Sequence, residues 1–156
     1  MAYNYSKLKK KDEAKKYYEL ALKYDPHNLD LLIDYITYLE SVEIGEALAV
    51  YAKVIAVLDK NPHLKVHPEF FNNYAATLIK NRKFAKEDRT EEYLIRAEQE
   101  NADGDPALTY FVKFNKGILY EEQAQFDKAI NEYHSLVTMN PLFQGRLGVL
   151  ICKIRF

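Results

Sequence analysis

The feature that most restricts the fold of this chain is one spacing of small, aromatic and proline residues that occurs near both ends. Each copy places an alanine, a tyrosine, another apolar residue and a proline at relative positions 0, 4, 7 and 12. The two copies are Ala14, Tyr18, Ala21 and Pro26, and Ala129, Tyr133, Leu136 and Pro141. A small residue and a tyrosine also stand 12 and 9 residues before each alanine, namely Ala2 with Tyr5 and Gly117 with Tyr120. Such internal similarity indicates a repeat architecture.

These offsets suit a hairpin of two helices, because steps of three and four residues keep side chains on one helical face. Small residues let the two backbones approach, and the proline follows a helix that it cannot continue. We expect the tyrosines at the repeated positions to fill the core, with Tyr18 and Tyr133 closing the gap toward the next repeat. The four core positions are Tyr18, Tyr51, Tyr120 and Tyr133. Tyr17, Tyr38 and Tyr110 lie off the pattern and are expected to be more accessible.

Two less regular units lie between these copies. The second unit has apolar stripes at Leu32 to Leu39 and Ala47 to Val54, with a turn shortened by one residue. The third has stripes at Phe71 to Leu78 and Thr90 to Ala97, with Thr90 where alanine is usual and a longer turn around Lys86 to Arg89. The expected helices are 2–9, 11–24, 28–41, 44–60, 67–82, 89–100, 105–122, 126–139 and 143–154.

The pattern resembles the tetratricopeptide repeat, which packs two antiparallel helices into about 34 residues. The resemblance implies an all-α, right-handed solenoid of helix pairs, a single domain over residues 1–156. Its repeats would be 1–27, 28–66, 67–104 and 105–141, with a partial repeat at 142–156. Because the first helix is short and the last segment ends apolar at Leu147 to Ile151, we expect a fragment of a longer array. Unpaired terminal helices would then favour self-association.

Composition narrows the classes of function. With 22 Lys+Arg against 23 Asp+Glu, the chain lacks the basic excess typical of nucleic-acid binding. No apolar run is long enough to span a membrane, so no membrane partner is expected. The single cysteine, Cys152, excludes an internal disulfide and favours a reducing compartment, the nucleus or the cytoplasm.

No motif for catalysis or cofactor binding is present, so we expect neither an enzyme nor a bound cofactor. His63 and His67 are four residues apart, but they lie between Pro62 and Pro68 without a further ligand residue, and we interpret them as loop residues. A run of six lysines from Lys7 to Lys16 is interleaved with acids and is interpreted as a solvated helix face.

Stacked first helices would line a concave groove for a protein partner. We count Ile36, Ala75 and Gly117 as the eighth position of their repeats. The second, fifth and sixth positions then hold several polar and aromatic residues. The candidate groove residues are Asp30, Asp34, Glu69, Asn72, Asn73, Phe111, Phe114 and Asn115. An amide side chain that recurs at one position in successive repeats could hydrogen-bond an extended peptide backbone. Alternatively, these polar residues could simply face solvent along the groove.

Related domains that clamp the acidic C-terminus of heat-shock chaperones carry Lys, Arg and Asn on these helices. The carboxylates of Asp30, Asp34 and Glu69 would repel such a ligand, which argues against a chaperone clamp.

A finer resemblance is carried by two strings, Glu43 to Asp59 and Pro68 to Ala76, the second reading Pro-Glu-Phe-Phe-Asn-Asn-Tyr-Ala-Ala. They are similar to central repeats of the large tetratricopeptide scaffold subunit of the polymerase-associated factor (Paf) elongation complex. This resemblance implies a nuclear scaffold that binds other Paf subunits and assists RNA polymerase II. The alternatives are a generic cytoplasmic tetratricopeptide adaptor and an RNA-processing helical-repeat protein.

Overall fold

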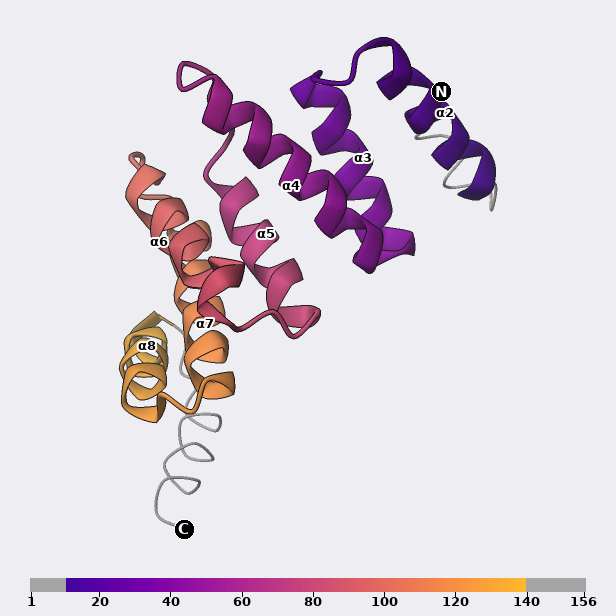
Figure 1. Ribbon diagram of the computed structural model, residues 1–156. Coiled ribbons are helices and arrows are strands. Elements are labelled where there is room, and N and C mark those ends of the chain that lie inside the picture. The colour runs from indigo at the N-terminus through magenta and orange to yellow at the C-terminus, as the bar shows by residue number, and fades with distance from the viewer. Residues whose placement is uncertain (1–10, 140–156) are drawn as a thin grey trace. The chain divides into compact units, whose positions relative to one another are not determined.

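A computed structural model describes residues 11–139 of the 156-residue chain. These residues contain seven α-helices and one short 3-10 helix, and no strand occurs among them (Figure 1). The chain forms two compact units, Met1–Lys65 and Val66–Phe156. Each unit is built from helices that pair with their neighbours in sequence.

The described part of the first unit consists of α2 (Lys11–Tyr24), α3 (Leu29–Val42) and α4 (Ile44–Lys60). Helix α3 contacts both α2 and α4. Asn28 caps α3, since its Oδ1 accepts a hydrogen bond of 3.0 Å from the Leu31 backbone N–H. The core of this unit is made of buried side chains on the facing sides of the helices. They include Ala14, Leu32, Ile36, Leu39, Ala47, Tyr51 and Val54.

The second unit contains α5 (Glu69–Lys80), the 3-10 helix η1 (Lys86–Asp88), α6 (Thr90–Glu100), α7 (Pro106–Glu122) and α8 (Phe126–Met139). Helices α5 and α6 form one pair and α7 and α8 the next, and α7 also contacts α5 and α6. Pro106 occupies the first turn of α7, where its missing N–H leaves no hydrogen bond unmade.

The seven helices expected between residues 11 and 139 are confirmed, with ends that agree to within about two residues. The longer turn at Lys86 to Arg89 is confirmed as well. It contains η1, followed by Arg89 in a left-handed conformation (φ 57°) immediately before the first residue of α6. The helices expected at 2–9 and 143–154, Pro141, the partial repeat 142–156 and Cys152 lie outside the described residues.

The core tyrosines are also confirmed, since Tyr18, Tyr51, Tyr120 and Tyr133 are all buried. The expectation for Tyr38 was wrong, because its side chain is only 7% exposed. Its ring centroid lies 5.5 Å from that of Tyr18 and 6.2 Å from that of Tyr35. The three rings form one aromatic layer between α2 and α3. Tyr38 is buried in this layer by its contacts with the other two rings, although its position off the apolar stripe of α3 predicted exposure.

Candidate partner-binding surface

The candidate surface in the second unit lies where α5 packs against α7. On α5, Glu69 and Asn73 are four residues apart and share a helix face, as do Phe111 and Asn115 on α7. Asn115 Nδ2 donates a hydrogen bond of 2.9 Å to Asn72 Oδ1, which joins the two helices directly. Asn72 Nδ2 in turn donates to Asn73 Oδ1 at 3.2 Å. We call this row of three side chains, Asn115, Asn72 and Asn73, the amide relay.

The amide relay runs from a buried interior toward solvent. Asn72 is 4% and Asn115 is 9% exposed, whereas Asn73 is half-buried. Each interior amide group is hydrogen-bonded, which is the condition under which buried amides do not destabilise a fold. At the half-buried end of the relay, Asn73 Nδ2 makes no further hydrogen bond to the described residues. This end therefore offers a donor to the carbonyl groups of a peptide backbone.

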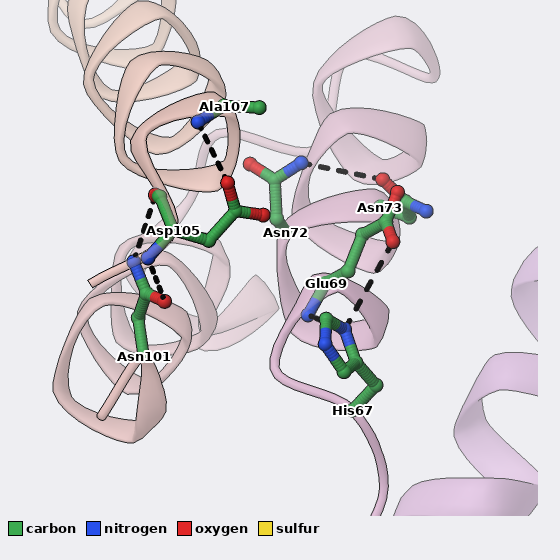
Figure 2. Close-up of polar contacts among 7 residues, drawn as sticks. All are labelled: His67, Glu69, Asn72, Asn73, Asn101, Asp105 and Ala107. Atoms are coloured by element: carbon green, nitrogen blue, oxygen red, sulfur yellow. Dashed lines mark hydrogen bonds and ion pairs between the residues drawn. The ribbon is translucent and has the colours of Figure 1, made fainter. Parts of the chain in front are cut away.

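An exposed carboxylate and an exposed aromatic ring flank the amide relay. Glu69, in the first turn of α5, lies 3.9 Å from His67 Nδ1 through its Oε2 atom, and its backbone N–H points to the same nitrogen at 3.4 Å (Figure 2). Phe111 on α7 remains 51% exposed, and its ring meets that of Tyr110 edge to face with centroids 5.5 Å apart. An aromatic side chain that stays exposed beside satisfied polar groups is a suitable anchor for a partner.

Hydrogen bonds among Asn101, Asp105 and Ala107 fix the start of α7 (Figure 2). Asp105 Oδ1 accepts from the Ala107 backbone N–H at 2.9 Å, which caps the helix. Asn101 holds Asp105 through two hydrogen bonds. Its Oδ1 accepts from the Asp105 N–H at 3.0 Å, and its Nδ2 donates to the Asp105 carbonyl at 3.2 Å. The cap determines where α7 begins and therefore the helical positions at which Phe111 and Asn115 follow.

The other expected groove residues are placed as follows within their own units. Asp30 and Asp34 are both exposed on α3, in the first unit. Phe114 is half-buried and packs against the α7–α8 core formed by Tyr120, Ala129, Tyr133 and Leu136, so its ring stabilises the repeat. In the second unit, hydrogen bonds bring Asn72, Asn73 and Asn115 together.

Two tyrosines of the second unit have raised pKa values. Burial raises the pKa of Tyr74 to about 12, with the neighbouring Tyr93 adding to the effect, so that this phenol is neutral at physiological pH. Burial, followed by the hydrogen bond of 2.7 Å from its hydroxyl to Glu91 Oε1, also raises the pKa of Tyr120. Both shifts keep phenols protonated and packed.

The described helices and histidines bear on metal binding and membrane insertion. No cluster of three or more His, Cys, Asp or Glu suited to a metal ion occurs within residues 11–139. His63 and His67 are exposed in the segment between α4 and α5. Among the helices described, none combines the length and the apolar character needed to cross a bilayer. In the lysine run, Lys15 pairs with Glu46 through a contact of 2.6 Å, and Lys7, Lys9 and Lys10 lie outside the described residues.

Sequence reasoning missed several residues that organise this unit. Thr90 Oγ1 donates to the Lys83 carbonyl at 2.8 Å, and Gln123 Nε2 donates to the Phe84 carbonyl at 2.7 Å. Lys116 is buried on α7 and contacts Glu98 Oε2 on α6 at 2.5 Å. These partners are 7 to 39 residues apart in the chain. No local pattern signals such pairs, although a threonine in place of the usual alanine at position 90 was a visible departure.

The family model named Tetratricopeptide repeat matches residues 1–28. No curated protein matches the chain. Among solved structures, a double mutant of MamA RS-1 superposes with a TM-score of 0.73 at 17% identity, covering 97% of this chain and 80% of that one. The fold is that of a tetratricopeptide-repeat protein.

Two further structures share the tetratricopeptide fold. A tetratricopeptide repeat protein from Parabacteroides merdae has a TM-score of 0.72 at 17% identity, covering 97% of this chain. PilW, a widely conserved type IV pilus biogenesis factor, has a TM-score of 0.63 at 22% identity, covering 90% of this chain. The chain spans 57% and 59% of the lengths of these two proteins. The all-α solenoid of helix pairs is thereby established. Tetratricopeptide-repeat proteins in general mediate protein–protein interactions.

Proposed function

We propose that this chain is a protein-binding scaffold that holds an extended segment of a partner against the face of α5 and α7. The observation that carries the proposal is the amide relay, whose buried members Asn72 and Asn115 are hydrogen-bonded to each other and whose half-buried end, Asn73, keeps its Nδ2 donor. An extended peptide could accept a hydrogen bond from Asn73 with its backbone and place an apolar side chain against Phe111.

Charge on this face favours some partners over others. Glu69 is exposed at the start of α5. A segment ending in a free carboxylate would meet repulsion from Glu69, whereas a neutral or basic segment would not. We therefore propose a neutral or basic peptide for the α5–α7 face and not the acidic terminus of a chaperone.

The finer assignment to a Paf-complex scaffold rests on the Glu43 to Asp59 and Pro68 to Ala76 strings. The Pro68 to Ala76 string contains Asn72 and Asn73, two of the three residues of the amide relay. Asn72 links α5 to α7 by its hydrogen bond with Asn115. None of the three structures described above is a Paf subunit. The scaffold proposal therefore has two forms. In the specific form the chain binds Paf subunits in the nucleus, and in the general form it is an adaptor in the cytoplasm.

Affinity capture with matched variants tests the proposal. Wild-type chain and Phe111→Ala are used as bait in nuclear and cytoplasmic extracts, followed by quantitative mass spectrometry. Loss of an aromatic anchor at a binding hot spot costs about 2 kcal/mol or more, so capture of the specific partner should fall roughly thirtyfold. Tyr24→Ala on α2 is the control, because Tyr24 is an aromatic side chain with 84% exposure in the other unit.

The outcomes separate the forms of the proposal. Paf subunits that depend on Phe111 support the specific form, and other proteins that depend on Phe111 support the general form. A partner set that is the same for wild type, Phe111→Ala and Asn73→Ala contradicts binding through this face. RNA that binds the chain in a salt-dependent manner would instead support the RNA-processing alternative.

A further inference from the structure

A second surface, in the first unit, has the properties of a docking groove. It is a hollow of about 620 Å³ formed by the end of α2, the start of α3, the end of α4 and the segment that follows α4. Its lining is mainly apolar, and the side chains that form it are Leu22, Pro26, Leu32, Ala56, Val57 and Leu64. We call this hollow the α2–α4 groove. It lies entirely within residues 22–64 and is separate from the α5–α7 face.

The floor of the α2–α4 groove is part of the core, whereas its walls are accessible. Leu32 and Val57 are buried beneath it, with 0% and 7% exposure. Leu22 and Leu64 are half-buried, and Ala56 is exposed on the wall formed by α4. An apolar side chain entering the groove would therefore meet carbon atoms on several sides without displacing a core residue.

The charged side chains that line the groove are two lysines. Lys53 and Lys60 lie on α4, seven residues apart and hence on the same helix face, while His27 and Asn61 complete the polar lining. No acidic residue is among the lining side chains. Neither Lys53 nor Lys60 forms an ion pair with any residue that the structure describes, so both ammonium groups are available to a ligand.

The groove continues along α2 and α4 beyond these lysines. An adjoining hollow of about 380 Å³ shares Leu22 and Lys53 with it and adds Lys23 from α2. Its far end is acidic, lined by Glu19 and Glu46, and Glu46 is already paired with Lys15 at 2.6 Å. The charged lining thus changes from Lys53 and Lys60 along α4 to carboxylates toward the start of that helix.

We infer that the α2–α4 groove docks a short acidic segment of a partner protein, with large apolar side chains inserted between Lys53 and Lys60 and carboxylates beside them. The apolar floor and the unpaired lysines are the two features that this ligand complements. The groove is open to solvent, so it would cover only one side of a bound segment. An amphipathic peptide keeps its other side in water, whereas a site for an acyl chain normally encloses most of the ligand surface.

Peptide display on the full chain tests this inference. A random peptide library is selected on wild-type protein and counter-selected on Lys53→Glu/Lys60→Glu. The control protein is Lys80→Glu/Lys83→Glu, which has the same net charge and changes two exposed lysines of the second unit. Selected peptides should be acidic and contain large apolar residues. Their affinity, measured by fluorescence anisotropy, should fall about tenfold or more on the groove variant and stay unchanged on the control.

A neutral variant separates the contribution of shape from that of charge. Ala56→Gln lengthens an exposed side chain on the groove wall and keeps a residue of good helix propensity, so folding should be preserved. It should weaken the selected peptides without altering their salt dependence, while raising the salt concentration should weaken binding to wild type.

Three results would overturn the inference. The first is a selection that yields no peptide distinguishing wild type from Lys53→Glu/Lys60→Glu. The second is a set of selected peptides without acidic residues, or peptides whose binding is lost on Phe111→Ala, which would place them on the α5–α7 face. The third is displacement of the peptides by a medium-chain fatty acid at equal concentration, which would identify the hollow as an acyl site.

Discussion

The ring of Tyr133 on α8 occupies the space that a Cβ atom on Gly117 of α7 would need. Such a Cβ would lie 2.7 Å from both Cδ1 and Cζ of that ring, well inside normal contact distance. Tyr133 is fully buried in the α7–α8 core and has no room to move aside. The glycine inside this 17-residue helix is therefore explained by the close approach of a tyrosine.

Gly117→Ala should destabilise the protein. Alanine is favoured over glycine in a helix by up to about 1 kcal/mol. Forcing a methyl group into a packed core typically costs about 1–3 kcal/mol, so a net loss of stability is expected. Urea denaturation of the full chain measures it. Gly45→Ala is the matched control, because a Cβ there would meet nothing within 4 Å, and it should be neutral or stabilising. Equal effects of the two substitutions would contradict the packing argument.

The hydrogen bond between Asn72 and Asn115 should contribute to the stability of the second unit. Asn115→Ala leaves a buried amide oxygen of Asn72 without its donor, which costs about 1–3 kcal/mol. Removing both partners should cost less than the sum of the two single substitutions, because the second change removes the unsatisfied group. Asn73→Ala, at the half-buried end of the relay, should have a smaller effect. Strict additivity in a double-mutant cycle would show that the amides are not coupled.

Thr90→Ala should destabilise the protein even though alanine is the usual residue at this repeat position. The hydroxyl of Thr90, at the start of α6, donates to the Lys83 carbonyl at 2.8 Å and ties down the long turn. Loss of this bond should cost about 1 kcal/mol. Thr90→Ser keeps the hydroxyl and should retain most of the stability. Thermal or urea unfolding in which the alanine variant equals or exceeds wild type would assign the threonine no structural role.

The helices could be predicted from the sequence because their signals are local. Stripes of apolar residues with a period near 3.6, together with capping residues such as Asn28 and Asp105, specify where each helix lies and starts. The repeat spacing then gives the pairing of neighbouring helices, and it also anticipated that Asn72 and Asn115 belong to one face. The contact between their side chains required the structure.

Features that depend on partners distant in sequence could not be predicted in this way. Tyr38 is off the apolar stripe of α3, but the rings of Tyr18 and Tyr35 cover it. Phe114 occupies an equivalent position to Asn72, yet it turns toward the α7–α8 core. The α2–α4 groove arises from three helices at once, and the seven-residue spacing of Lys53 and Lys60 was its only signal in the sequence.

The buried tyrosines should make the protein sensitive to alkaline pH. Burial raises the pKa of Tyr35 to about 12, above the value of about 10 for an unfolded tyrosine. A phenol with a raised pKa contributes its full stabilisation below the unfolded pKa. That contribution is lost as the pH rises through the folded pKa. Stability should therefore decline from about pH 10 and fall steeply toward pH 12, where the folded phenol itself ionises.

Tyr35→Phe isolates this effect, because phenylalanine keeps the ring in its stack with Tyr18, at a centroid distance of 5.0 Å, and cannot ionise. Circular dichroism recorded with phenolate absorbance during an alkaline titration should show a higher unfolding midpoint for this variant than for wild type. Tyr24→Phe, which changes a side chain that is 84% exposed, should leave the midpoint where it is. An unchanged midpoint in Tyr35→Phe would mean that ionisation of this buried ring does not drive alkaline unfolding, and that another buried phenol, such as Tyr74, ionises first.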